Sequence, residues 1–143
     1  MTPPTLTQLI PVLQVAIGPV ILISGIGLLL LSMTNRYGRT IDRARELTQA
    51  RRKTRTEILD QQIAILWRRA QILRRAIFLG TVSVLLAAIL IIVLFAAALL
   101  QLEAGWLLGL IFGACLITLI ASLIDSIRDV NQSLVAVRLE VES

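Results

Sequence analysis

The sequence predicts an all-α membrane protein, in which three transmembrane helices extend into a cytoplasmic antiparallel three-helix bundle. Hydrophobic residues make up 57% of the 143 residues, whereas an ordinary soluble domain holds roughly 45 to 50%. Twelve of the 14 Lys and Arg residues lie within positions 35–75, and uncharged apolar runs flank this basic stretch on both sides. We therefore interpret the chain, 1–143, as a single integral membrane domain.

Three uncharged apolar runs, about 9–33, 76–100 and 106–124, are long enough to cross a bilayer. Roughly 20 residues suffice for a helix to cross the hydrocarbon core. Pro19 lies in the middle of the first run, where it removes a backbone donor and is expected to kink the helix. Five residues join the second run to the third, and this length permits only a tight connection. The runs therefore predict three transmembrane helices.

The distribution of basic residues predicts the orientation of the chain. The connection 101–105 holds one acid, Glu103, and no base, while the stretch 35–75 holds twelve bases. Basic residues concentrate on the cytoplasmic side of membrane proteins. We therefore place the helical hairpin 35–75 and the C-terminal helix 125–143 in the cytoplasm, with the N-terminus outside.

A pI of about 11.0 ordinarily suggests a nucleic acid as partner. Here the charge lies between membrane spans, so we expect no nucleic acid and instead anionic lipid headgroups on the cytoplasmic side. Four arginines before the second span form the candidate lipid-binding cluster: Arg68, Arg69, Arg74 and Arg75. A plainer role, compatible with the first, is to set the orientation of the chain in the membrane.

The cytoplasmic segments carry apolar or small residues at alternating steps of three and four. This 3.5-residue repeat is typical of helices that pack along a seam. It predicts three buried seams, at positions 37, 41, 44 and 48, at 59, 63, 66, 70, 73 and 77, and at 123, 127, 130, 134, 137 and 141. The chain is expected to turn within the polar segment 50–56. The alternative is a set of separate amphipathic helices that lie on the membrane surface.

Small residues in two of the spans recur at spacings that let helices approach closely in lipid. In the first span they form one face with Gln14 and Ser32, and in the third they lie four apart. These candidate helix-packing residues are Gly18, Gly25, Gly105, Gly109 and Gly113. We expect both faces to pack within the chain. The alternatives are a pore lining or a contact between subunits for the first face, and self-association for the second.

Two acids, Asp125 and Asp129, follow directly after the third span, at about the same membrane depth as Arg36, Arg39, Arg74 and Arg75. A charge so close to hydrocarbon is costly unless it is paired. We therefore expect structural ion pairs among Arg36, Asp125 and Asp129. The alternative is a proton or cation site.

Three fragments beside the spans are Thr34-Asn35-Arg36, Asp42-Arg43-Ala44-Arg45-Glu46-Leu47 and Ile65-Leu66-Trp67-Arg68-Arg69-Ala70. With them, nearly the whole chain resembles a bacterial family of uncharacterised three-span membrane proteins, known as a domain of unknown function. The resemblance implies a bacterial inner membrane or a thylakoid membrane. It carries no mechanism and no functional residue.

The chain has no His and one Cys, and nothing in it supplies a nucleophile together with a base. We therefore expect no enzyme, no cofactor and no metal site. The expected function is that of a scaffold or assembly subunit of a membrane complex or homo-oligomer, whose partner is itself or another membrane protein. The alternative is a small channel made by several copies, with four residues toward the pore: Gln14, Gly18, Gly25 and Ser32.

Overall fold

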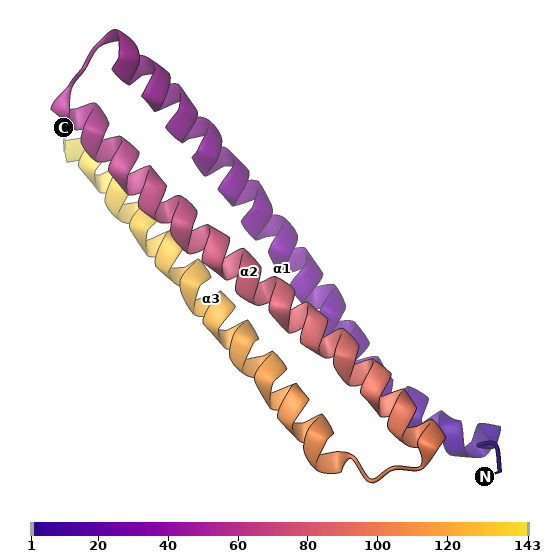
Figure 1. Ribbon diagram of the computed structural model, residues 1–143. Coiled ribbons are helices and arrows are strands. Elements are labelled where there is room, and N and C mark those ends of the chain that lie inside the picture. Colours follow the sequence, from indigo (N-terminus) through magenta and orange to yellow (C-terminus); the bar gives the residue numbers. More distant parts are fainter. Residues whose placement is uncertain (1, 143) are drawn as a thin grey trace. The chain divides into compact units, whose positions relative to one another are not determined.

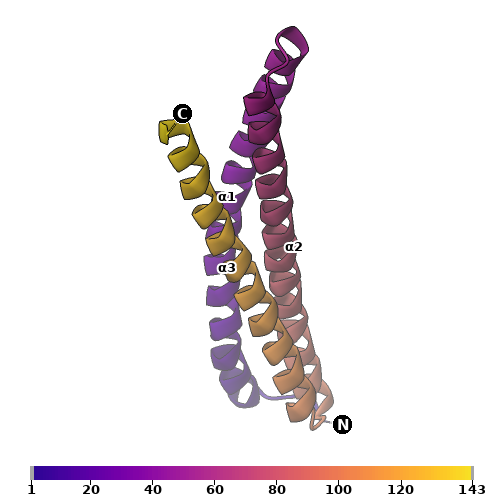
Figure 2. The same cartoon turned by 90° about the vertical axis from the view of Figure 1, so that its left-hand side faces the viewer.

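The computed structural model describes residues 2–142, and this part of the chain forms three long α-helices and no β-strand (Figures 1 and 2). The helices are α1 (Leu6–Lys53), α2 (Glu57–Leu100) and α3 (Gly105–Glu142). Each contains one of the predicted apolar runs, and each is long and apolar enough to cross a membrane. The prediction of an all-α chain with three candidate spans is therefore confirmed, and each span continues into a polar arm without a break.

The start of α1 and the first connection follow local sequence signals. The Thr5 backbone N–H donates to Gln8 Oε1 at 3.2 Å, an arrangement in which the side chain satisfies a free donor at the helix start. Basic residues fill the last turn of α1, where they face the negative end of the helix dipole. The turn lies between Lys53 and Glu57, inside the predicted segment, and the Thr56 carbonyl accepts the first bonds of α2.

The second connection is as short as predicted, and its geometry is set by Gln101. This residue adopts the left-handed conformation, with φ of 53°. The Leu102 N–H then donates to the Ala97 carbonyl at 3.0 Å, which satisfies a free acceptor at the end of α2. Glycine is the usual residue at such a position, because a side chain costs roughly 1–2 kcal/mol there.

The chain packs as two compact units, which are described separately. The apolar unit comprises Met1–Leu29 and Gly80–Ile120, and Glu103 is its only charged residue. The charged unit comprises Leu30–Leu79 and Ala121–Ser143 and holds all 14 Lys and Arg residues.

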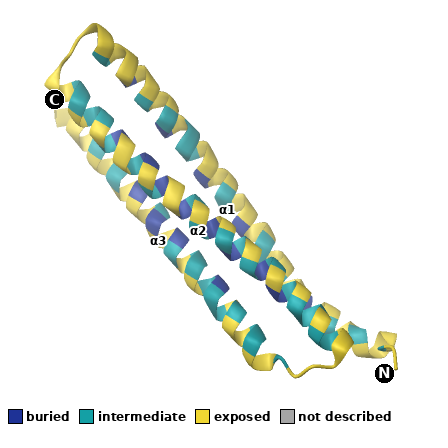
Figure 3. Ribbon diagram, in the orientation of Figure 1, coloured by how far each residue is buried: buried dark blue, intermediate teal, exposed yellow. Residues whose placement is uncertain are grey.

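The apolar unit buries few side chains and exposes many large apolar ones (Figure 3). Between α2 and α3, the Ser83 hydroxyl donates to the Cys115 carbonyl at 3.0 Å, and the Cys115 thiol donates to the Ser83 carbonyl at 3.3 Å. Both side chains are fully buried. The polar groups at this contact are thus satisfied internally while the outer surface stays apolar, as a helix in a lipid bilayer requires.

The glycines of the apolar unit do not pack as expected within the chain. A Cβ added at Gly18, Gly25, Gly105, Gly109 or Gly113 would meet no described atom within 4 Å. Gly18 and Gly25 are exposed on α1, whose buried residues in this unit are Ala16 and Ile26. Packing of these glycines against another chain stays a prediction.

In the charged unit, the predicted seam of α2 is confirmed. Leu66, Ala70 and Leu73 are buried, and the outer members of the seam are half-buried. On α1 the buried positions of this unit are Met33, Thr40 and Leu47. The Thr40 hydroxyl donates to the Arg36 carbonyl at 2.9 Å, so this polar side chain can be buried at little cost. Of the four predicted α1 positions, 37, 41 and 44 are half-buried and 48 is exposed. The predicted α1 seam is therefore confirmed only in part, because the fully buried positions 40 and 47 lie next to predicted ones.

The predicted seam of α3 is wrong. All six of its apolar residues are exposed, at positions 123, 127, 130, 134, 137 and 141. The face of α3 that points into the charged unit instead carries Ser122, Asp125 and Asp129. The reason is that the two acids find their counter-charges on α1 and α2, and a helix cannot turn both faces inward at once.

Candidate functional site

The centre of the charged unit is Asp129 of α3, whose side chain is 0% exposed. Its carboxylate accepts from Arg36 of α1 and from Arg69 Nε of α2, the latter at 3.2 Å. Arg36 Nη1 also donates to the Ser126 hydroxyl at 3.4 Å. One carboxylate therefore links α3 to both other helices.

A second carboxylate lies one helical turn earlier on the same face of α3. The side chain of Asp125 is 5% exposed and forms ion pairs with Arg75 Nε of α2 at 3.2 Å and with Arg128 Nη1 at 3.4 Å. Beside it, the Ser122 hydroxyl donates to the Ala76 carbonyl at 2.7 Å. Small hydroxyl side chains on this face let α3 approach α2 closely, so the short Asp side chains can reach their partners.

The electrostatics of this cluster favour a structural role. Removing a carboxylate from water costs several kcal/mol unless opposite charges and hydrogen bonds compensate. Each of the two acids has two guanidinium partners. Three of these four ion pairs are also charge-assisted hydrogen bonds, which are stronger than neutral ones, whereas Asp125 Oδ2 pairs with Arg75 without a hydrogen bond. The acids are thus engaged with arginine. The described residues contain no group of three or more His, Cys, Asp or Glu side chains arranged to hold a metal ion.

The structure brings Arg36 and Asp129 together, while Asp125 pairs with Arg75 rather than with Arg36. Two members of the candidate lipid-binding cluster, Arg69 and Arg75, thus bind carboxylates of α3. Sequence reasoning placed Arg75 at the depth of the two acids but missed the role of Arg69, although Arg69 directly precedes Ala70 of the buried α2 face.

The other two members of the cluster, Arg68 and Arg74, are exposed. Within the described residues neither forms an ion pair. These two arginines therefore remain as the candidates for contact with anionic headgroups.

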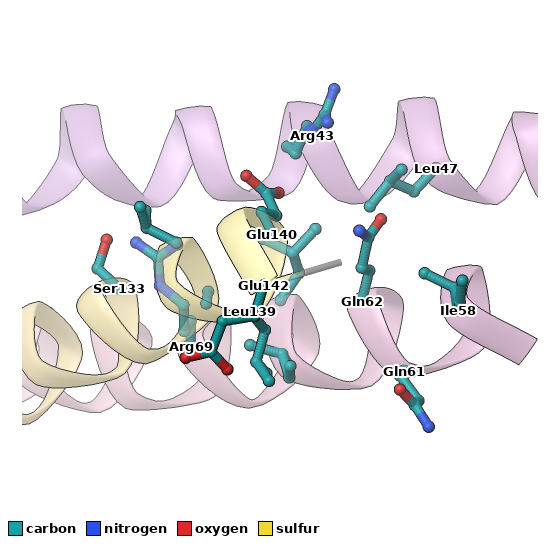
Figure 4. Close-up of a pocket in the computed structure, with 14 residues that line it drawn as sticks. Arg43, Leu47, Ile58, Gln61, Gln62, Arg69, Ser133, Leu139, Glu140 and Glu142 are labelled. Atoms are coloured by element: carbon teal, nitrogen blue, oxygen red, sulfur yellow. The ribbon is translucent and has the colours of Figure 1, made fainter.

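A cavity of about 410 Å³ lies among the three helices of the charged unit (Figure 4). In that view Leu47 of α1 and Gln62 of α2 point toward one another across the space. Ile58 and Leu66 add apolar wall, and Glu140 of α3 adds charge. The lining therefore combines apolar side chains with two arginines and two glutamates, Arg43, Arg69, Glu140 and Glu142.

Replacement of Asp129 by Asn should lower the free energy of unfolding by about 3–5 kcal/mol, because Arg36 and Arg69 would lose their shared buried counter-charge. The matched control is Asp60→Asn in the half-exposed pair that Asp60 forms with Arg51 at 2.8 Å. It should cost at most about 1 kcal/mol. Reversible unfolding of the purified protein in mixed micelles measures both, and equal effects would contradict a structural role for Asp129.

Comparison with known proteins agrees with this picture and adds no activity. Residues 16–139 match the model of a family described as protein of unknown function (DUF2721). No curated protein and no solved structure matches the chain. Because the match takes in most of the sequence, including the ion-pair cluster, the chain belongs to this family of proteins of unknown function.

Proposed function

We propose that this protein is a non-catalytic scaffold or assembly subunit of a membrane complex or homo-oligomer. The observation that carries the proposal is that two faces of α3 in the charged unit differ in their contacts. Its acids Asp125 and Asp129 form ion pairs inside the chain, whereas six of its apolar residues form an exposed stripe. An exposed apolar surface of this kind marks an interaction site more often than a catalytic one.

The orientation and location of the chain are part of the proposal. The positive-inside rule supports a charged unit in the cytoplasm, organised as an antiparallel bundle of the arms of α1, α2 and α3. The chain would then lie in a bacterial inner membrane or a thylakoid membrane, with its N-terminus outside. Arg68 and Arg74, exposed beside the second span, would contact anionic lipids, each base gaining about 1 kcal/mol.

Labelling of single cysteines tests the orientation. In a Cys115→Ser background, Thr54→Cys in the first connection and Glu103→Cys in the second should react with an impermeant thiol reagent from opposite sides of the membrane. Thr54→Cys should react only from the cytoplasmic side, because twelve bases lie in its connection and none in the other. Reaction of both from the same side would exclude the proposed topology.

Purification from the native membrane in lipid nanodiscs tests the scaffold. We expect a particle larger than one 15.7 kDa protomer, containing either further copies or a constant second membrane protein. An unrelated three-span protein, purified in parallel, identifies contaminants that bind any membrane protein. A particle that holds a single protomer and no constant partner would contradict the proposal.

A small channel made by several copies is the second candidate. Gln14, Gly18, Gly25 and Ser32 of α1 are all exposed, which leaves this weakly polar face free to line a pore between subunits. Against it, the membrane spans hold no ionisable group, and the few polar residues of one copy are too scattered to conduct ions.

Recordings in planar bilayers separate the channel from the scaffold. The purified protein should show no unitary conductance, because a conducting path needs a continuous polar lining. Gln14→Leu removes the largest polar side chain of the candidate pore face, and Val15→Leu is the control on the neighbouring face. A reproducible single-channel current that Gln14→Leu changes and Val15→Leu leaves unchanged would favour the channel instead.

A further inference from the structure

Six of the nine exposed large apolar residues of α3 in the charged unit form one continuous stripe, which we name the outer stripe. Their exposed fractions range from 38% to 80%. The stripe consists of Leu123, Ile127, Val130, Leu134, Val137 and Val141. Its steps of four, three, four, three and four place all six side chains along one side of the helix, which is the pattern of a coiled-coil seam. A seam without a partner within the described chain requires one from outside it.

The ion pairs determine the direction in which the outer stripe points. At about 100° per residue, the centre of the stripe lies roughly 130° around α3 from the face of Ser122, Asp125 and Asp129. Because that face is bound to α1 and α2, the stripe lies on the outer side of α3. Of its six residues only Val137 also lines the cavity among the three helices. Within the charged unit, α3 can therefore pair its acids with α1 and α2 or bury its apolar stripe against these helices, but it cannot do both.

We infer that the outer stripe binds the outer stripe of a second copy of this chain, with the two α3 helices parallel. The inference deepens the proposed function, on which it rests, by naming the partner and the surface. Copies inserted with the same orientation bring their α3 helices out of the membrane in the same direction, so a parallel pairing sets equal residues of the two stripes against each other. Ser126, Asn131 and Ser133 flank the stripe without charge. The two charged residues beside it, Arg138 and Glu140, have opposite signs, and in a parallel pair Arg138 faces the uncharged Ser133 of the second copy, so the two faces meet without repulsion between like charges.

The length of the stripe makes this pairing depend on the membrane. From Leu123 to Val141 the helix rises about 27 Å, or fewer than three heptads, and soluble coiled coils are typically recognised from three to four. Anchoring in one membrane raises the effective concentration of the copies, as linking two binding modules does. In addition, α3 is already helical and held by its ion pairs, so little ordering is left for the association step.

Disulfide cross-linking in native membranes tests the contact directly. In a Cys115→Ser background, Leu134→Cys should give a covalent dimer under mild oxidation. The control is Val135→Cys, which is similarly exposed but lies on a different side of α3. It should give several-fold less dimer. Equal cross-linking of the two, or none at Leu134→Cys, would overturn the inference.

A second experiment introduces a charged residue into the outer stripe. In nanodiscs, Leu134→Lys should reduce the particle from two protomers to one of 15.7 kDa, while Val135→Lys should leave it unchanged. Both variants should keep the thermal unfolding of a single chain, because both side chains are exposed.

The outcomes separate the inference from the proposed function. If Leu134→Lys still forms the wild-type oligomer, or if the wild type holds a different protein in place of a second copy, the outer stripe does not bind itself and the scaffold proposal stands. If the wild type is a single protomer without a partner, both fail. Reaction of Leu134→Cys with a lipid-soluble thiol reagent only, without cross-linking, would assign the stripe to the membrane surface and also overturn the inference.

Discussion

The arrangement of the charged unit depends on the burial of one carboxylate. Asp129 has no exposed side-chain surface, so it must be compensated from within the chain. The compensation comes from Arg36 and Arg69, which belong to the two other helices. Since a pair of this kind needs short donor–acceptor distances, it fixes the height of α3 and its rotation about its own axis. The exposure of the outer stripe follows from this rotation.

A buried ion pair is not by itself a strong source of stability, because the cost of desolvation offsets much of the attraction. What it contributes here is the choice of one packing among several. Without charges on α3, its apolar stripe would be a suitable inward face, and the helix would present the opposite side to the outside. The two acids make that alternative packing costly. If α3 were rotated so that its apolar stripe faced inward, Arg36 and Arg69 would lose Asp129 as their partner, and the face with the two acids would lie on the outside of the unit. The ion pairs thus determine which face of α3 packs against α1 and α2 in the charged unit.

In the apolar unit, a few hydrogen bonds satisfy the polar groups between helices whose outer surfaces are apolar. Its contact between α2 and α3 joins the side chain and backbone of Ser83 to those of Cys115, so no polar group at this contact is left without a partner. The Thr118 hydroxyl donates to carbonyls of its own helix at 2.8 and 3.0 Å. Large apolar side chains face outward, and glycines leave open surface on α1 and α3. Such a unit offers surfaces for lipid or for another membrane helix.

The sequence by itself determined the elements whose signals are local. Three apolar runs predicted three helices, the polar segment 50–56 predicted the first turn, and the repeat through Leu66, Ala70 and Leu73 predicted the buried face of α2. These features depend on neighbours within a few residues along the chain. Composition and the basic cluster likewise indicated where charge would gather.

Only the tertiary structure decided which faces meet. Asp129 binds residues 60 and 93 positions away in the sequence, and no local pattern reports such a pairing. For that reason the role of Arg69 was missed, the fully buried positions of α1 lie next to predicted ones, and the α3 seam was assigned inward. A 3.5-residue repeat shows that a face can pack, but it does not name the partner. On α3 the ion pairs of Asp125 and Asp129 determine which face packs inward, and the apolar repeat is therefore exposed.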